Sequence, residues 1–141
     1  LNTKELYEIF KLRCEVFVVE QEILYNDFDD KDYKAIHLSG FKGGKLMAYG
    51  RIFNKGDYYP NNPGFGRVAV LEKERGNDYG KELVKKCMEV CERNFEEKEI
   101  KISAQAYLEK FYLDLGFEFR GEKYIEDGIP HCAMYYNKKT N

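Results

Sequence analysis

The spacing of hydrophobic residues changes along the chain and predicts where helices and strands lie. In "ELYEIFKLRCEVFVVEQ", residues 5–21, apolar side chains recur at helical spacing, which predicts an N-terminal helical region with one apolar face. Residues 35–41 and 46–53 are rich in β-branched and aromatic side chains instead. They flank "KGGK", so they predict an antiparallel hairpin with Gly43 and Gly44 in its turn.

The rest of the chain predicts further strands and helices in alternation. An apolar strand opens at Phe65 with "FGRVAV", and the segment that follows it has helical spacing to about Phe95. Residues 99–105 predict another strand, residues 107–117 a short helix stopped by Gly116, and residues 117–137 two strands joined around Asp127 and Gly128. This order of elements predicts an α/β (α+β) fold in which helices pack on a mixed sheet.

Two stretches between these elements have the composition of loops. "NDFDDKDYK", residues 26–34, is acidic but lacks the glycine and the closing glutamate of a calcium loop, so it predicts a solvated acidic loop. Asn54 to Gly64, with Pro60 and Pro63, predicts a surface loop.

Length and charge narrow the class of protein. A chain of 141 residues with 43% hydrophobic content predicts one globular domain over residues 1–141. Because 23 Lys and Arg face 25 Asp and Glu, a nucleic-acid partner is not expected. No apolar run approaches the ~18 residues that span a bilayer, and no signal-peptide pattern opens the chain. We therefore expect no membrane partner and a cytoplasmic location.

The cysteines predict core packing rather than a metal site. Cys87 and Cys91 share the apolar stripe of the predicted long helix. Two cysteines one helical turn apart could form half of a metal site, but no Cys or His pair with zinc spacing accompanies them. We expect no metal.

The segment Arg75 to Gly80, "RGNDYG", lies between a predicted strand and a predicted helix. It matches neither a P-loop, since Glu82 stands where a hydroxyl is required, nor a G-x-G-x-x-G fingerprint. Flexible residues could still turn backbone amides toward an anion at the start of the helix. A tight turn from strand to helix explains the glycines equally well.

Two segments of the chain resemble motifs of the Gcn5-related N-acetyltransferases (GNAT superfamily). Arg75 and Gly80 fit the family's pyrophosphate loop, Arg/Gln-x-x-Gly-x-Gly/Ala, with Asp78 in place of the middle glycine. A later segment has the family's spacing, with glutamine replacing asparagine at its start: Gln105, Tyr112, Gly116 and Phe117. The stretches "LRCEVFVVEQ", "AQAYLEKFYLDLGF" and "EDGIPHCAMY" resemble the ElaA-like branch.

The resemblance implies a fold and a cofactor site. It implies a mixed, mostly antiparallel, twisted sheet that splays at its central strand and is flanked by helices. It also implies acetyl-CoA as co-substrate, an amine as acceptor, and compatibility with a homodimer. The cofactor-binding residues that it implies are Val68, Ala69, Val70, Arg75, Gly76, Asn77, Asp78, Tyr79, Gly80, Gln105 and Tyr112.

Acetyl-CoA is already activated, so direct attack by an amine of a small molecule or peptide needs no protein nucleophile. By resemblance Tyr112 is the acid that protonates the leaving thiolate. His131, or Glu20 acting through water, is the candidate base, and both are candidates for acceptor binding together with Arg67. An acyl-enzyme on Cys132 is disfavoured, because the adjacent His131 would point to the other face of a strand.

The departures at Asp78 and Gln105 leave a second class of function open. A CoA-binding regulatory module would keep the fold and the cofactor site without turnover. An acyltransferase that uses a longer acyl chain is a third alternative.

Overall fold

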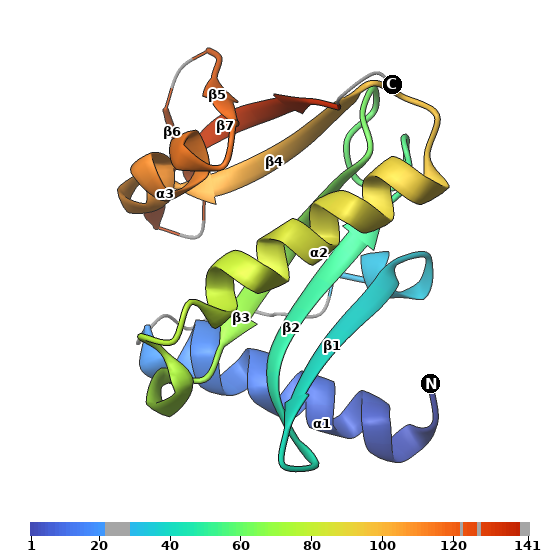
Figure 1. Cartoon of the computed structure of the whole chain (residues 1–141), viewed down its shortest axis with the longest axis vertical. Helices are drawn as coiled ribbons and strands as arrows, with labels where there is room; N and C mark the ends of the chain where they lie inside the picture. The colour runs from blue at the N-terminus through green and yellow to red at the C-terminus, as the bar shows by residue number, and fades with distance from the viewer. Residues whose placement is uncertain (22–28, 122, 127, 139–141) are drawn as a thin grey trace.

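The chain folds into a seven-stranded sheet with helices on its faces, as the computed structural model in Figure 1 shows. The structure describes residues 1–21, 29–121, 123–126 and 128–138. The strand order is β1-β2-β3-β4-β7-β5, with β6 paired to β7, and every pairing is antiparallel except that of β3 with β4. The strands are β1 (Ile36–Lys42), β2 (Lys45–Phe53), β3 (Gly64–Val70), β4 (Glu99–Gln105), β5 (Glu118–Phe119), β6 (Tyr124–Glu126) and β7 (Ile129–Asn137).

The first helix starts at a capping box. The Asn2 side chain accepts from the Glu5 N–H at 2.8 Å, and the Glu5 carboxylate accepts from the Asn2 N–H at 3.1 Å. The predicted N-terminal helical region is confirmed, with a π-helical continuation that the pattern did not indicate. No helix in the described part of the chain is long and apolar enough to cross a bilayer. The helices are α1 (Thr3–Arg13), η1 (Cys14–Glu20), η2 (Lys31–Tyr33), η3 (Glu72–Glu74), α2 (Tyr79–Asn94), η4 (Ala106–Leu108) and α3 (Glu109–Asp114).

Two helices cover opposite faces of the β1–β3 part of the sheet (Figure 1). On the α1 face, Ile9 and Leu12 pack against Tyr49 and Ala69. On the other face, Leu83 of α2 packs against Ala48 and Val70. These two residues adjoin Tyr49 and Ala69 in sequence, and neighbouring residues of a strand point to opposite faces. The α2 face continues into the largest core cluster, which contains Cys87 and Cys91, so the prediction that these cysteines pack in the core is confirmed.

The sheet is split between β3 and β4. These strands pair only where Gly64 meets Lys101, whose N–H donates to the carbonyl oxygen of Pro63 at 2.9 Å. Farther along β3, Arg67 and Val68 together occupy the space opposite one residue of β2, and Arg67 takes a left-handed φ of 49°. Such a bulge bends its strand, so β3 and β4 diverge from their junction (Figure 1). The predicted mixed, mostly antiparallel sheet with a splayed central strand is confirmed.

The prediction that residues 26–34 form a solvated acidic loop is wrong for two carboxylates, those of Asp29 and Asp32. Arg13 and Arg51, whose side chains are 0% and 1% exposed, both donate to Asp32 Oδ1, at 2.7 and 3.1 Å. Arg51 also binds Asp29 through two hydrogen bonds of 2.8 and 2.6 Å. The loop therefore neutralises two buried guanidinium groups. The first part of it, residues 26–28, lies outside the described residues.

Replacing Asp32 with asparagine is expected to lower the free energy of unfolding by about 3 kcal/mol, because it removes one anion from two buried cations. Urea unfolding followed by circular dichroism measures the change. Asp30→Asn is the matched control, since the Asp30 side chain is exposed, and it should stay within about 0.5 kcal/mol of wild type. Equal midpoints for the two variants would contradict the structural role of Asp32.

The C-terminal part of the chain contains more strands than predicted. Glu118 and Phe119 form β5, which pairs with β7, and β6 then pairs with the start of β7. The pattern merged β5 and β6 because both are short. Asp127 of the predicted turn lies outside the described residues, and Gly128 has a positive φ of 77°.

The loop from Asn54 to Gly64 is only partly a surface loop. Tyr58 packs its ring against Phe53, with the centroids 5.1 Å apart, and Tyr59 contacts Tyr58 edge-on at 4.8 Å. Both tyrosine side chains turn inward, and the strand begins at Gly64 rather than Phe65.

Candidate active site

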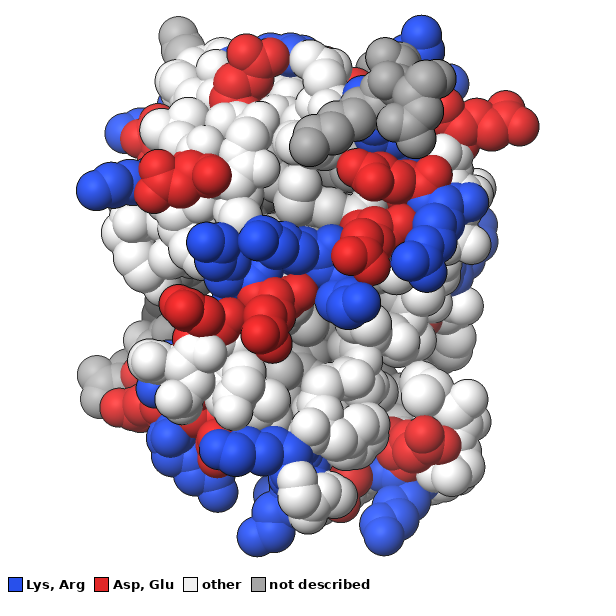
Figure 2. Space-filling view, viewed as in Figure 1, with Lys and Arg blue, Asp and Glu red and all other residues white. Residues whose placement is uncertain are grey.

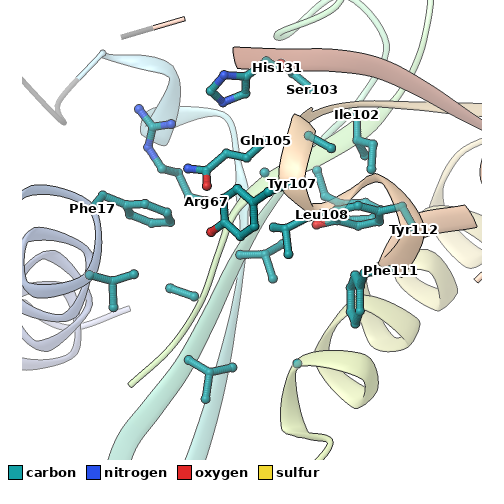
Figure 3. Close-up of a pocket in the computed structure, with 18 of the residues that line it drawn as sticks. Phe17, Arg67, Ile102, Ser103, Gln105, Tyr107, Leu108, Phe111, Tyr112 and His131 are labelled. Carbon is teal, nitrogen blue, oxygen red and sulfur yellow. The ribbon is translucent and has the colours of Figure 1, made fainter. Parts of the chain in front are cut away.

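A cavity of about 690 Å³ follows the split between β3 and β4. Its wall on one side comes from β4, η4 and α3, and on the other side from β3 and η1. Figure 3 shows Gln105, Tyr107 and Tyr112 approaching from the first side, and Arg67 and Phe17 from the second. One end of the cavity reaches the turn before α2, and the other reaches β6 and the start of β7.

The turn before α2 leaves backbone amides available to a ligand. Asp78 is the N-cap residue of α2 and has a left-handed φ of 62°, and its side chain makes no capping hydrogen bond. The amides of the first helical turn therefore keep no intrahelical or side-chain partner. A positive φ explains why a glycine would suit this position, and aspartate tolerates it better than most residues. Of the predicted loop residues, Gly76, Asp78, Tyr79 and Gly80 line the cavity, as does Arg75.

Asn77 is not brought to the cavity wall. Its side-chain amide donates to the carbonyl oxygen of Glu74 at 3.2 Å, so it stabilises the turn itself.

Figure 2 shows acidic and basic side chains interleaved on the face that carries α2, without a large area of one sign.

Arg75 and Glu20 form a bidentate ion pair that the sequence did not predict. The two Arg75–Glu20 hydrogen bonds measure 2.7 and 2.8 Å, and Arg75 Nε donates to the Val70 carbonyl oxygen at 3.0 Å. The pair joins the end of η1 to the turn before α2. Both carboxylate oxygens of Glu20 are engaged by the Arg75 guanidinium, so in this state Glu20 is bound to Arg75 rather than presented to an acceptor.

Tyr112 lies in α3 with its hydroxyl directed into the cavity (Figure 3). Its side chain is buried, and its ring makes edge contacts with Phe111 and Phe117 at centroid distances of 5.1 and 5.6 Å. Burial raises the pKa of the Tyr112 hydroxyl far above its ordinary value. The hydroxyl therefore stays protonated at neutral pH, which is the form a general acid needs.

His131 and Glu126 lie at the other end of the cavity. His131 Nδ1 is 2.8 Å from the carbonyl oxygen of Ile129, and His131 Nε2 is 3.4 Å from Glu126 Oε2. Ser103 Oγ donates to the same carboxylate oxygen at 3.2 Å. The register places His131 opposite Gln105, the last residue of β4.

The candidate acid and base reach the cavity from opposite faces of the sheet. Tyr112 belongs to the core on the α2 face, together with Cys132. His131 and Gln105 point to the other face, where Arg67 lies over the ring of Phe17 at 5.7 Å. The prediction that His131 and Cys132 point to opposite faces is therefore confirmed, and the split connects the two groups of residues.

Sequence reasoning missed several residues at the His131 end of the cavity. Glu126 and Ser103 are on different strands, and Tyr58 and Tyr59 are in the segment whose composition predicts a surface loop. Glu126 belongs to the "EDGIPH" stretch beside His131, which was the one available signal. No group of three His, Cys, Asp or Glu side chains within the described ranges is arranged to hold a metal ion.

The split sheet, with an amide-rich turn at its carboxyl edge, has the layout that the family resemblance implied. Residues 5–138 match the acetyltransferase (GNAT) domain family. The chain belongs to this family. GNAT membership supports a CoA-dependent acyltransferase activity. The protein ElaA of Escherichia coli strain K12 is 41% identical over 136 residues, which cover 95% of this chain and 88% of ElaA.

Solved structures share this GNAT fold. The crystal structure of E. coli ElaA has a TM-score of 0.89 at 39% identity, over 97% of this chain and 93% of that one. An acyl-CoA N-acyltransferase from Pseudomonas aeruginosa has a TM-score of 0.90 at 36% identity, over 96% and 92% of the two chains. A GNAT family acetyltransferase from Elizabethkingia anophelis, solved with acetyl-CoA bound, shares the fold at 12% identity and a TM-score of 0.68, over 91% and 89%.

Proposed function

We propose that this protein is an acetyl-CoA-dependent N-acetyltransferase. It transfers the acetyl group to an amine of a small molecule or peptide by direct attack within a ternary complex. The observation that carries the proposal is the cavity through the split sheet, which runs from the first helical turn of α2 to His131. Such a cavity admits two reactants from opposite faces and lets them meet between β3 and β4.

The cofactor end supplies contacts for a diphosphate and a thioester. The first-turn amides and the positive end of the α2 dipole suit the diphosphate, and Arg75 adds a charge once Glu20 shares or releases it. Beyond Gly64, the β4-facing edge of β3 has no strand partner among the described residues, so backbone groups of Val68–Val70 are available to the pantetheine arm. An N–H there that is aimed at the developing oxyanion contributes roughly 3 kcal/mol.

The reaction then needs two proton movements. His131 accepts a proton from the acceptor ammonium, and the resulting amine attacks the thioester carbonyl carbon. The C–S bond breaks, and Tyr112, kept protonated by its burial, donates its proton to the departing thiolate. The second proton lost by nitrogen restores the Tyr112 hydroxyl. Gln105 at the end of β4 lies between these groups as a cofactor contact, and Arg67 faces an anionic part of the acceptor.

Titration calorimetry with acetyl-CoA tests the proposal. We expect binding to acetyl-CoA and about 100-fold weaker binding to acetyl-pantetheine, which lacks the diphosphate. A thiol-release screen over polyamines, amino acids, aminoglycosides and peptide N-termini then seeks the acceptor, with acetyl-, succinyl- and longer acyl-CoA compared on the best one. Absence of acetyl-CoA binding would overturn the proposal.

A further inference from the structure

We propose that Glu126 and His131 together bind the ammonium group of the acceptor, and that the acceptors are small primary amines that enter as cations. The inference rests on the proposed N-acetyltransferase function and deepens it. It assigns an acceptor-binding role to Glu126 and states in which charge form the substrate arrives.

The geometry presents two hydrogen-bond acceptors side by side. Nδ1 of His131 donates to the carbonyl oxygen of Ile129 at 2.8 Å, so the neutral imidazole carries its lone pair on Nε2. This atom faces Glu126 Oε2 at 3.4 Å. A neutral imidazole and a carboxylate cannot satisfy each other. An ammonium group can donate one N–H to each of them.

Among the described residues at this end of the cavity, no Lys or Arg is paired with the Glu126 carboxylate. The polar partners of Glu126 within the described chain are His131 and Ser103. By contrast, the nearby carboxylates Asp29 and Asp32 are bound by Arg51. A cationic ligand would supply the missing counter-charge.

The surroundings of Glu126 suit a cation as well. Burial and then the charge of Glu126 raise the pKa of Tyr58, and both residues line this cavity. Tyr124 hydrogen-bonds Ser103 and stacks on His131 with the ring centroids 6.2 Å apart, so it holds the imidazole in place. Arg51, which also lines the cavity, is held by Asp29 and Asp32.

The binding mode also prepares the nucleophile. The R–NH3⁺ group transfers one proton to His131 Nε2, and the imidazolium then pairs with Glu126. The neutral amine attacks the thioester carbonyl carbon, the C–S bond breaks, and Tyr112 donates its proton to sulfur. The second proton lost by nitrogen then passes to the Tyr112 phenolate and restores its hydroxyl. The products are the N-acetyl amine, CoA thiol and one proton, which His131 releases to solvent.

Nuclear magnetic resonance of the histidine side chains tests this site without turnover. The chain has two histidines, and His37, which bonds the Asp32 carbonyl oxygen at 3.0 Å, is an internal control. In the presence of CoA, n-butylammonium should shift the His131 Cε1–H resonance and leave that of His37 unchanged. Butyramide, a neutral molecule of similar shape, should shift neither.

Variants of Glu126 separate charge from structure. Glu126→Gln should weaken n-butylammonium binding at least about tenfold, whereas Glu126→Asp should retain part of it. An unchanged His37 resonance shows that the variants are folded. Equal effects of butyramide and n-butylammonium, or equal binding by wild type and Glu126→Gln, would overturn the inference. Calorimetry with acetyl-CoA should be unaffected by Glu126→Gln, so failure of the cofactor site is seen separately from failure of the ammonium site.

Discussion

Replacing Tyr112 with phenylalanine is expected to lower kcat by about 100-fold or more, with little change in the KM for acetyl-CoA. The variant keeps the buried ring and its contacts with Phe111 and Phe117, and it removes only the hydroxyl that points into the cavity. The departing thiolate then loses its proton donor, while the contacts to the cofactor persist. Steady-state thiol release with the best amine of the acceptor screen measures both constants.

Tyr136→Phe is the matched control for this experiment. Tyr136 contacts the same aromatic cluster, with its ring centroid 5.4 Å from that of Phe117, but it is not part of the cavity wall. Its kcat should stay within about twofold of wild type. Equal kcat values for Tyr112→Phe and wild type at all pH values would remove Tyr112 from the mechanism.

The protonation state of Tyr112 also predicts the pH profile. Burial holds the pKa of Tyr112 far above that of a free tyrosine, so its hydroxyl remains protonated across the usual assay range. Raising the pH within this range therefore does not deprotonate the acid. We expect kcat to show no alkaline fall below about pH 10.

Replacing Gly64 with alanine is expected to lower the free energy of unfolding by about 3 kcal/mol, or the melting temperature by about 10 °C. A Cβ at Gly64 would lie 2.1 Å from the carbonyl oxygen of Lys101 and 2.8 Å from a ring carbon of Tyr59. Because the nearest atom belongs to the backbone, only separation of β3 from β4 relieves the overlap. This is the one described point at which those strands pair.

Gly66→Ala provides the control for Gly64→Ala. Gly66 is also in β3, its φ is not positive, and a Cβ there meets no atom within 4 Å. Its melting temperature should stay within a few degrees of wild type. Similar melting curves for the two variants in scanning calorimetry would mean that the β3–β4 junction does not depend on the absence of a side chain at Gly64.

The sequence alone predicted those features that a short stretch of chain encodes. The strand over Glu99–Gln105 was expected with the bounds that the structure shows, because alternate residues along it are apolar and face the core. The hairpin at Gly43 and Gly44 and the long helix after the turn were also predicted locally. The family resemblance supplied the splay of the central strand, which periodicity cannot encode.

Only the tertiary structure decided which distant residues meet. Glu20 binds Arg75 and Asp29 binds Arg51, although each pair is far apart in sequence and each carboxylate, taken locally, looks solvated. Glu126 became a candidate because β6 and β7 bring it to His131. The spacing of apolar residues reflects which side of one element faces water, so it is enough to predict strands and helices. Ion pairs and sites depend on how the elements pack, and packing is decided by the whole chain at once.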